Sequence, residues 1–159
     1  MQRMDLHVRA MRRFGRTRLF GVVMPVLAPP VDRLAHRLSG GRLRVGQLFL
    51  PTLMLTTMGR RSGQPRATPV AYVREGDGFA LLATNFGKPD HPAWSANLLA
   101  QPDALVTVDG GPLPVRARLA EGAERDRLWR RFNEVWPAYE TYVQRSGRTP
   151  RMFVLEPRA

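Results

Sequence analysis

Three arginines, a serine and two glycines stand within eight residues, at positions 59–66. Guanidinium groups donate forked hydrogen bonds, and glycine-containing turns leave backbone N–H groups open, so this composition suits a phosphate or a carboxylate. The G-x-x-x-x-G-K-[ST] spacing of a Walker loop, with its following helix, is absent. Two interpretations remain from the residues alone: an anion site, or a solvated turn in an arginine-rich chain.

A second candidate region spans residues 85–100. It begins as a loop, and Pro92 suits the first turn of a helix that we expect to run to about residue 100. Trp94 and Asn97 are three residues apart and therefore share one face of that helix. Asn97 is there either a structural hydrogen-bonding group or a group that holds a ring carbonyl or a phosphate.

A third candidate is a pair of tyrosines, Tyr139 and Tyr142, which face the same way on a turn that follows a proline. A phenol can donate a proton or orient a substrate; the competing interpretation is partial burial with the hydroxyl at the rim. A metal site is not indicated, because the chain has no cysteine and its histidines, His7, His36 and His91, form no cluster.

The scaffold that must position these groups is mainly β. Apolar, β-branched or alternating runs bounded by turn residues predict strands. We expect strands at 53–58, 67–72, 79–84, 104–108, 113–119 and 152–155, and helices at 92–100 and 122–136. Mostly antiparallel strands with a helix between hairpins favour a compact, partly closed barrel over a doubly wound sheet. The predicted class is therefore α+β, mainly β, with peripheral helices.

The length and the net charge of the chain restrict the possible functions further. The chain has 159 residues, 43% of them hydrophobic, and a formal net charge of +12 carried by arginine with a single lysine, Lys88. Residues 1–50 hold ten arginines against two aspartates, so most of the excess lies in the first third. An excess of positive charge of this size favours anionic partners such as acidic lipid, nucleic acid or a polyanionic cofactor. A general bias toward arginine is the alternative cause.

The first 48 residues are expected to be a basic helical extension, and residues 49–159 the cofactor-binding barrel domain. The apolar run at 19–28 is too short to span a bilayer, and its prolines fit a secretion signal poorly. Residues 1–45 are both basic and amphipathic, and this combination suggests contact with a membrane surface. The alternative is packing on the barrel or on a partner subunit. We expect a cytoplasmic protein, peripheral to the inner membrane face if that contact forms.

Three segments in order carry a resemblance to a known family. They are TTMGRRSGQPR at 56–66, HPAW with NL at 91–98, and WPAY at 136–139. Together they resemble the deazaflavin-dependent nitroreductases, split β-barrel (FMN-binding-like) proteins that use coenzyme F420. The resemblance covers about residues 50–157. Two departures are a Thr84-Asn85 pair where some relatives have serine and lysine, and Trp136 where they have tyrosine.

The resemblance implies a role for each matching residue. The basic turn would bind the phosphate and the acidic tail of the cofactor, the following strand and the helix would enclose the deazaflavin, and the tyrosines would act on the substrate. The cofactor-binding residues implied are Arg60, Arg61, Ser62, Arg66, Thr68, Pro69, Leu82, Thr84, Asn85, Ala93, Trp94 and Asn97. The catalytic residues implied are Tyr139 and Tyr142.

The implied reaction is hydride transfer from reduced F420 to a quinone, a nitroaromatic or an activated alkene. Two other classes remain open: a non-catalytic carrier of flavin (FMN), haem or F420 on the same fold, and a basic peripheral membrane-binding protein. Nucleic acid is not an expected partner, because no reader module appears and the aromatic residues are not interleaved with the basic ones. The chain is expected to be a monomer or a homodimer.

Overall fold

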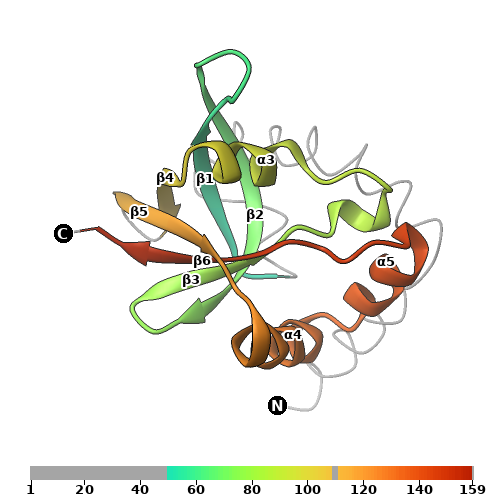
Figure 1. The fold of residues 1–159 in the computed structure, drawn as a ribbon. Helices are drawn as coiled ribbons and strands as arrows, with labels where there is room; N and C mark the ends of the chain where they lie inside the picture. Colours follow the sequence, from blue (N-terminus) through green and yellow to red (C-terminus); the bar gives the residue numbers. More distant parts are fainter. Residues whose placement is uncertain (1–49, 109–110, 159) are drawn as a thin grey trace, which may run out of the picture.

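The computed structural model describes residues 50–108 and 111–158. Six strands and three α-helices make up this part of the chain (Figure 1). The strands are β1 (Thr52–Met58), β2 (Pro65–Glu75), β3 (Gly78–Leu82), β4 (Asp103–Val108), β5 (Gly111–Leu119) and β6 (Met152–Pro157). The helices are α3 (Ala93–Ala100), α4 (Gly122–Val135) and α5 (Ala138–Ser146), with a short 3-10 turn, η2 (Asn85–Gly87).

The strands form a closed antiparallel barrel in the order β1-β2-β3-β6-β5-β4. Three hairpins, β1–β2, β2–β3 and β4–β5, join neighbours in sequence. The β1–β4 pairing closes the ring, with Leu55 opposite Val106. The predicted order of elements is confirmed, and the barrel is closed where the sequence pattern predicted a partly closed one.

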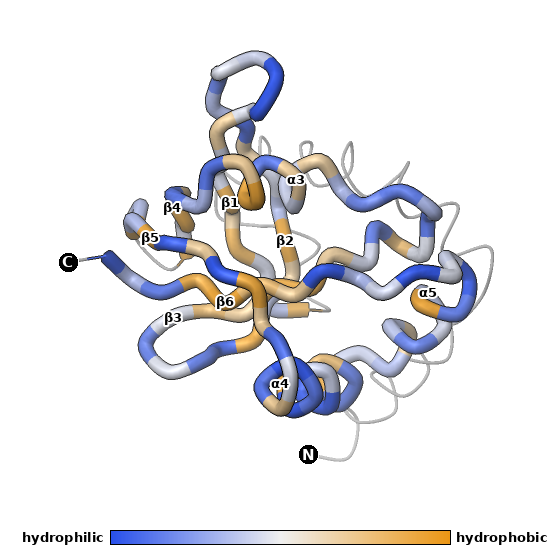
Figure 2. Tube along the Cα trace, viewed as in Figure 1, coloured by the Kyte–Doolittle hydropathy of each residue, from blue (hydrophilic) through white to orange (hydrophobic). Residues whose placement is uncertain are grey.

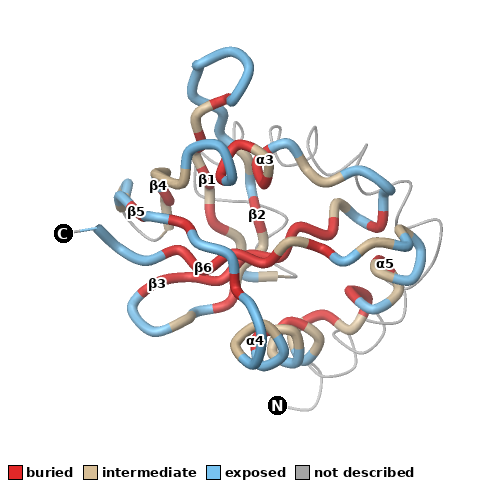
Figure 3. The backbone as a smooth tube through the Cα atoms, in the orientation of Figure 1, coloured by how far each residue is buried: buried red, intermediate tan, exposed pale blue. Residues whose placement is uncertain are grey.

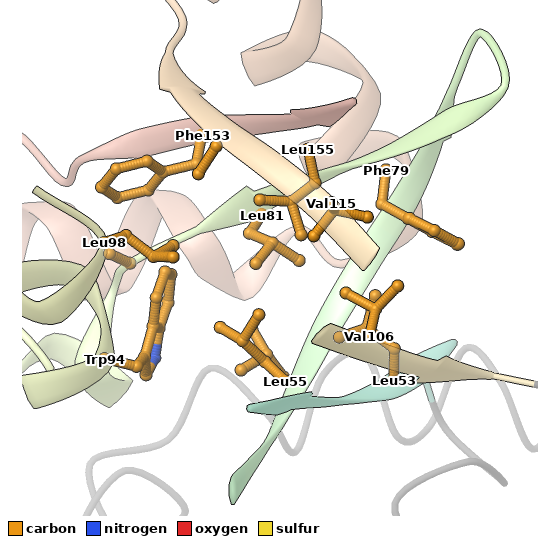
Figure 4. Close-up of a cluster of buried hydrophobic side chains, with 13 residues drawn as sticks. Leu53, Leu55, Phe79, Leu81, Trp94, Leu98, Val106, Val115, Phe153 and Leu155 are labelled. Atoms are coloured by element: carbon orange, nitrogen blue, oxygen red, sulfur yellow. The ribbon is translucent and has the colours of Figure 1, made fainter. Parts of the chain in front are cut away.

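Alternation along the strands fills the barrel interior. Leu53 and Leu55 on β1 are fully buried, while Met54 between them is only partly buried. Side chains from all six strands meet inside the barrel, and Trp94 and Leu98 of α3 pack against them at one end (Figure 4). This inner core therefore fixes α3 to the end of the barrel from which the 59–64 turn projects.

A second core lies on the outer face of β3 and β6. Ala80 and Leu82 of β3 face α4 and α5 there, whereas Phe79 and Leu81 face the barrel interior. Both faces of the strand are covered, which explains why its sequence is continuously apolar rather than alternating (Figure 3). In Figure 2 the hydrophobic residues accordingly gather where the strands cross, and the outer side of α4 is hydrophilic.

Ion pairs attach α4 to β2 and β5, the strands that flank β3 and β6. Glu75 at the end of β2 accepts hydrogen bonds from Arg127 and Arg131, and Arg118 on β5 pairs with Glu124 and Glu156. The hydrogen bond from Arg127 holds the pKa of Glu75 below its ordinary value. These arginines therefore have structural partners.

Within residues 50–108 and 111–158, no helix has the length and apolar character needed to cross a membrane. The predicted extension at 1–48, and the membrane contact assigned to residues 1–45, lie outside the described residues. The domain boundary at residue 49 stays a prediction.

A glycine in β3 tests the barrel packing. A Cβ atom on Gly78 would lie 2.0 Å from the carbonyl oxygen of Leu155, and backbone cannot move aside as a side chain can. We expect Gly78→Ala to lower the free energy of unfolding by about 1–3 kcal/mol, as overpacked cores do. Gly111→Ala is the matched control, because a Cβ atom on Gly111 would meet no heavy atom within 4 Å among the described residues beyond its chain neighbours. Equal urea midpoints for the two variants would contradict this packing.

Candidate active site

Hydrogen bonds within the basic turn between β1 and β2 fix its backbone conformation. The N–H of Gly59 donates to Gln64 O at 2.8 Å, and the N–H of Gly63 donates to Gly59 O at 2.7 Å. Gly63 has φ +63°, in the left-handed region that glycine adopts without strain. The Ser62 hydroxyl accepts a hydrogen bond from the N–H of Gln64. The turn is thus closed on itself and exposed to solvent.

The three arginines of this turn have no acidic partner in residues 50–108 and 111–158. Arg60, Arg61 and Arg66 are exposed, and among the described residues none of their guanidinium groups forms an ion pair or a hydrogen bond. By contrast, five of the arginines on β5, on α4 and near the C-terminus, from Arg116 to Arg158, are paired with carboxylates. Three like charges in one turn repel one another, so the turn is suited to a polyanion that neutralises them.

Asn97 anchors this turn to the barrel. Its Nδ2 donates to Thr57 Oγ1 at 3.0 Å, and its Oδ1 accepts from the backbone N–H of Arg60 at 3.1 Å. Thr57 and Asn97 are both buried. Of the alternatives left by the sequence, the structural role of Asn97 is therefore present: it fixes the position of the basic turn against α3.

The residues after the turn divide between the two faces of β2. Thr68 lies opposite Leu55, and Arg66 opposite Thr57, so both belong to the side that faces the barrel interior and α3. Pro69 lies opposite Met54 and is exposed on the outer side. The register brings Thr68 and Arg66 together with Trp94 and Asn97, and it leaves Pro69 apart from them. Ala93 is exposed at the start of α3.

The other predicted residues gather at the far end of β3. Leu82 packs in the outer core with Tyr139 and Tyr142. Thr84, which is buried, and Asn85, which is partly buried, follow in the segment that runs on to α3. Phe86 in this segment contacts the ring of Tyr142, with 6.3 Å between ring centroids. The predicted site thus forms two groups, one at the basic turn and α3, the other beside α5, and residues 83–91 connect them.

The two tyrosines differ in their surroundings. Burial raises the pKa of Tyr139 strongly, and its ring packs edge-on against Phe132 at 5.8 Å. Burial also raises the pKa of Tyr142, but a hydrogen bond from Trp136 opposes that rise. The indole N–H can only donate, so it supports the negative charge that would develop on the Tyr142 oxygen. Trp136, which departs from the family pattern, thus acts on one of the predicted catalytic residues.

A cavity of about 320 Å³ borders the basic turn from another side. Its walls come from β1, β2, β4 and β5, among them Thr57, Pro65 and Leu105, and from Arg158, which follows β6. Neither tyrosine nor Trp94 lines it, so it is not the space between the two groups.

Sequence reasoning missed three residues that support the site. Thr57 holds Asn97 across 40 positions of sequence. Arg148 holds the 83–91 segment, and Trp136 acts on Tyr142. Nothing near these residues in sequence indicates a partner, because each contact forms only when distant elements pack together.

Similarity to known proteins identifies the family. The family described as F420H(2)-dependent quinone reductase matches residues 32–157. The chain belongs to this family. The match begins ahead of the predicted domain boundary and covers the whole barrel.

Individual relatives agree with this membership. The F420H(2)-dependent quinone reductase Rv1261c of Mycobacterium tuberculosis is 33% identical over 77% of this chain and 79% of the relative. A relative named putative F420H(2)-dependent quinone reductase, Rv3178 of the same species, is 29% identical over 73% of this chain and all of its own length. A solved F420-H2 dependent reductase (FDR-A) is 34% identical, with a TM-score of 0.61 over 67% of this chain and 94% of its own.

The family confirms the predicted resemblance, the split-barrel fold, the class of oxidoreductase and coenzyme F420 as the cofactor, in preference to FMN. The part that each site residue plays is a separate question. The donor set of the turn fits an acidic cofactor, because its three guanidinium groups form no ion pair, and the N–H groups of Arg61 and Ser62 form no backbone hydrogen bond, among the described residues.

The anchoring role of Asn97 can be tested without cofactor. Asn97→Ala leaves the Thr57 hydroxyl and the Arg60 N–H without this partner, so we expect the free energy of unfolding to fall by about 1–3 kcal/mol. Gln101→Ala, at the exposed end of the same helix, is the control and should change it by less than about 0.5 kcal/mol. Chemical denaturation measures both. A loss no larger than that of the control would show that the two hydrogen bonds do not hold the turn.

Proposed function

We propose that this chain is an F420H2-dependent quinone reductase whose cofactor is held at the basic turn and α3. Reduced F420 supplies a hydride when it is bound, and a quinone is the expected acceptor, with nitroaromatics and activated alkenes as related electron-poor substrates. The observation that carries the proposal is a turn, anchored by Asn97 in a chain of this family, whose three arginines are unpaired among the described residues.

The turn would bind the acidic part of the cofactor. Arg60, Arg61 and Arg66 offer guanidinium forks, and Ser62 offers a hydroxyl together with its backbone N–H. Thr68 and Trp94, on the same side of the barrel, would border the ring system, and Ala93 would leave room beside it. Pro69, on the outer face, would contribute only by restricting the backbone.

The 83–91 segment and α5 would form the acceptor side, beside the edge of the cofactor ring that the resemblance assigns to Leu82, Thr84 and Asn85. Leu82, Thr84 and Asn85 lie where β3 ends, next to the helix that carries the tyrosines. Reduction of a quinone to a quinol requires one hydride and one proton. The cofactor supplies the hydride, and an acid beside the acceptor or the solvent supplies the proton. A phenol that faces the acceptor would supply it.

Tyr142 is the better candidate for that proton. The hydrogen bond from Trp136 and then the charge of Arg145 lower the cost of charge on its oxygen, whereas burial and then Tyr142 disfavour a charged Tyr139. A general acid works best when its pKa lies near the working pH, so the environment of Tyr142 is the more suitable of the two. Tyr139, packed on Phe132, would position α5.

Two further properties extend the proposal. A small-molecule acceptor is the partner that the family implies, and a solved structure described as a domain-swapped dimer is 29% identical, with a TM-score of 0.63 over 80% of this chain and 99% of its own. A homodimer is thus one arrangement for this chain. Cytoplasmic location, and contact of residues 1–45 with a membrane surface, stay predictions.

The first experiment is a titration of the protein with oxidised F420, FMN and haem, followed by reoxidation of reduced F420 with menadione. Selective F420 binding with turnover is the expected result. Preference for FMN or haem, or binding of F420 without turnover, would assign the protein to the carriers and reject the proposed function.

Removal of the turn arginines should weaken cofactor binding. We expect Arg60→Ala and Arg61→Ala each to weaken F420 binding by about 1.5–3 kcal/mol, the range for a charged hydrogen bond. Arg130→Ala, an exposed residue of α4 outside the turn, is the matched control. Fluorescence titration gives the affinities. Binding as tight in both turn variants as in the control would exclude the turn as the anion site.

Proton donation separates the two tyrosines. Tyr142→Phe removes the phenol that receives the Trp136 hydrogen bond, and we expect kcat with menadione to fall by about 10²-fold, at the lower end of general acid catalysis. Tyr139→Phe should retain most of the turnover, because it keeps the ring that packs on Phe132. Stopped-flow reoxidation of reduced F420 measures the step. The reverse ranking of the two variants would assign the proton to Tyr139.

A further inference from the structure

Arg148, just after α5, makes an unusual set of contacts with the 83–91 segment. Its Nη2 donates to Thr84 O at 2.8 Å and to Asp90 O at 3.1 Å, and its Nη1 donates to Ala83 O at 3.1 Å. Its Nε donates to Lys88 O at 3.3 Å. One guanidinium therefore joins both ends of the segment, although it lies far from them in sequence.

This arginine has no carboxylate partner within the described residues. All four of its carbonyl acceptors are neutral. Burial and then the charge of Arg151 lower its pKa below the ordinary value for arginine, and the charge of Asp90, which forms no ion pair with it, opposes that shift only in part. A partly buried charge that forms no ion pair is a cost to folding. The hydrogen bonds from the Arg148 guanidinium offset that cost only while the 83–91 segment keeps the conformation that brings these carbonyl groups together.

The shape that Arg148 holds is itself strained. Asn85 has φ 51° and Phe86 has φ 56°, and a phenylalanine rarely adopts this left-handed region. Gly87 follows with φ +78°, and a Cβ atom there would lie 3.1 Å from the Cα of Tyr142. Asn85 closes the segment by donating from Nδ2 to Asp90 O at 2.9 Å. Left without Arg148, two strained residues would relax to more favourable conformations.

His91 makes the fifth contact of Arg148. Its Nδ1 lies 3.0 Å from Nη1 of Arg148. Arginine only donates, so Nδ1 must accept, and the ring is neutral with its proton on Nε2. A protonated His91 would lose this acceptor and set a second positive charge against Arg148.

The charges around His91 act in the same direction. Burial, Arg148 and Arg151 lower its pKa, in that order. Arg151, which directly precedes β6, also donates to Ser95 of α3, a helix whose eight residues carry no charge. Lys88 and Asp90 belong to the segment itself, and Arg145 on α5 lies against Gly87.

We propose that Arg148 is a positioning residue, which with neutral His91 clamps the 83–91 segment in the strained conformation that presents Thr84 and Asn85 beside α5. The clamp itself does not depend on catalysis. Its effect on turnover rests on the proposed function, since it sets the place of Thr84, Asn85 and Phe86 next to Tyr142. Acid opens the clamp by protonating His91.

The direction of the pH dependence follows from linkage. In the folded protein His91 binds its proton less readily than in the unfolded chain, so the unfolded state holds more protons at mildly acidic pH. The stability contributed by the clamp is therefore complete above the ordinary histidine pKa, near about 6.5. It is lost as pH falls below that value and through the lowered pKa of the folded state.

The first test uses hydrogen–deuterium exchange of the full chain without cofactor. We expect Arg148→Gln to reduce the protection of the Gly87 and Lys88 amides, which donate to Thr84 O and Asn85 O, while the amides of β3 keep theirs. Arg130→Gln is the matched control and should leave both unchanged. Unchanged protection of residues 84–91 in Arg148→Gln would overturn the clamp, as would an equal loss throughout β3, which would indicate general unfolding.

The second test isolates His91. His91→Asn keeps an acceptor near the position of Nδ1 but does not titrate. Between about pH 7.5 and about pH 5, a range that spans the histidine pKa, the wild-type segment should lose protection relative to β3 and the variant should not. Parallel pH curves for the two proteins would overturn the role of His91 in the clamp.

Kinetics then connect the clamp to turnover. In Arg148→Gln we expect kcat/KM for menadione to fall by about tenfold to a hundredfold, as displaced substrate-contacting groups do. The Kd for F420, set mainly at the basic turn, should change by less than about threefold. Loss of segment protection with an unchanged kcat/KM would overturn the catalytic part of the proposal. If the wild-type protein shows no F420 turnover, the proposed function is rejected instead. The exchange experiments then still test whether Arg148 holds the 83–91 segment.

Discussion

Burial of β3 and β6 on both faces is the constraint on which the rest of the structure depends. One face of each strand closes the barrel core, and the other supports α4 and α5. The same two strands therefore hold α3 at one end of the barrel and the tyrosine helix outside it. Because β3 ends at Leu82 and α3 begins at Ala93, the chain must cross from the outer core to α3 in a short connection, and most of that crossing is the 83–91 segment.

The arginines of this basic chain differ in the groups that they bind. Arg118, Arg127 and Arg131 bind carboxylates and attach α4 to the barrel. Arg148 binds carbonyl oxygens and holds backbone. Exposed pairs of the first kind contribute little stability individually, so they do not explain the high arginine content. The turn arginines differ because they have no partner among the described residues, and a high net charge alone would not predict which of the groups is left unpaired.

The sequence predicted the order of strands and helices because the signals are local. Alternation in β1, the apolar run of β3 and the glycine turns each lie within a few residues, and hydrophobic burial acts on them independently of context. The boundaries were less accurate: β2 runs to Glu75, beyond the predicted end at 72, because pairing with β3 continues the strand past Tyr72. Of the site, residue types were identifiable through the family resemblance, but their division into two groups was not. It follows from packing between distant elements: Asn97 of α3 holds the basic turn, whereas Leu82 packs with Tyr139 and Tyr142 in the outer core. The separate position of Pro69 follows from its pairing with Met54, since register is a property of the assembled sheet.

The two halves of the site are held by the same kind of interaction, and this explains why neither anchor was visible in the sequence. Asn97 uses an amide to fix the basic turn, and Arg148 uses a guanidinium to fix the 83–91 segment; each binds backbone atoms of a distant loop. Backbone acceptors and donors carry no sequence signature, so nothing at Arg60 or at Thr84 indicates a partner. Loops that carry binding groups have few apolar contacts of their own, and a rigid polar anchor from a packed helix supplies the order that burial does not. The geometry of the site thus depends on α3 and on the end of α5 as much as on the residues that would touch the cofactor.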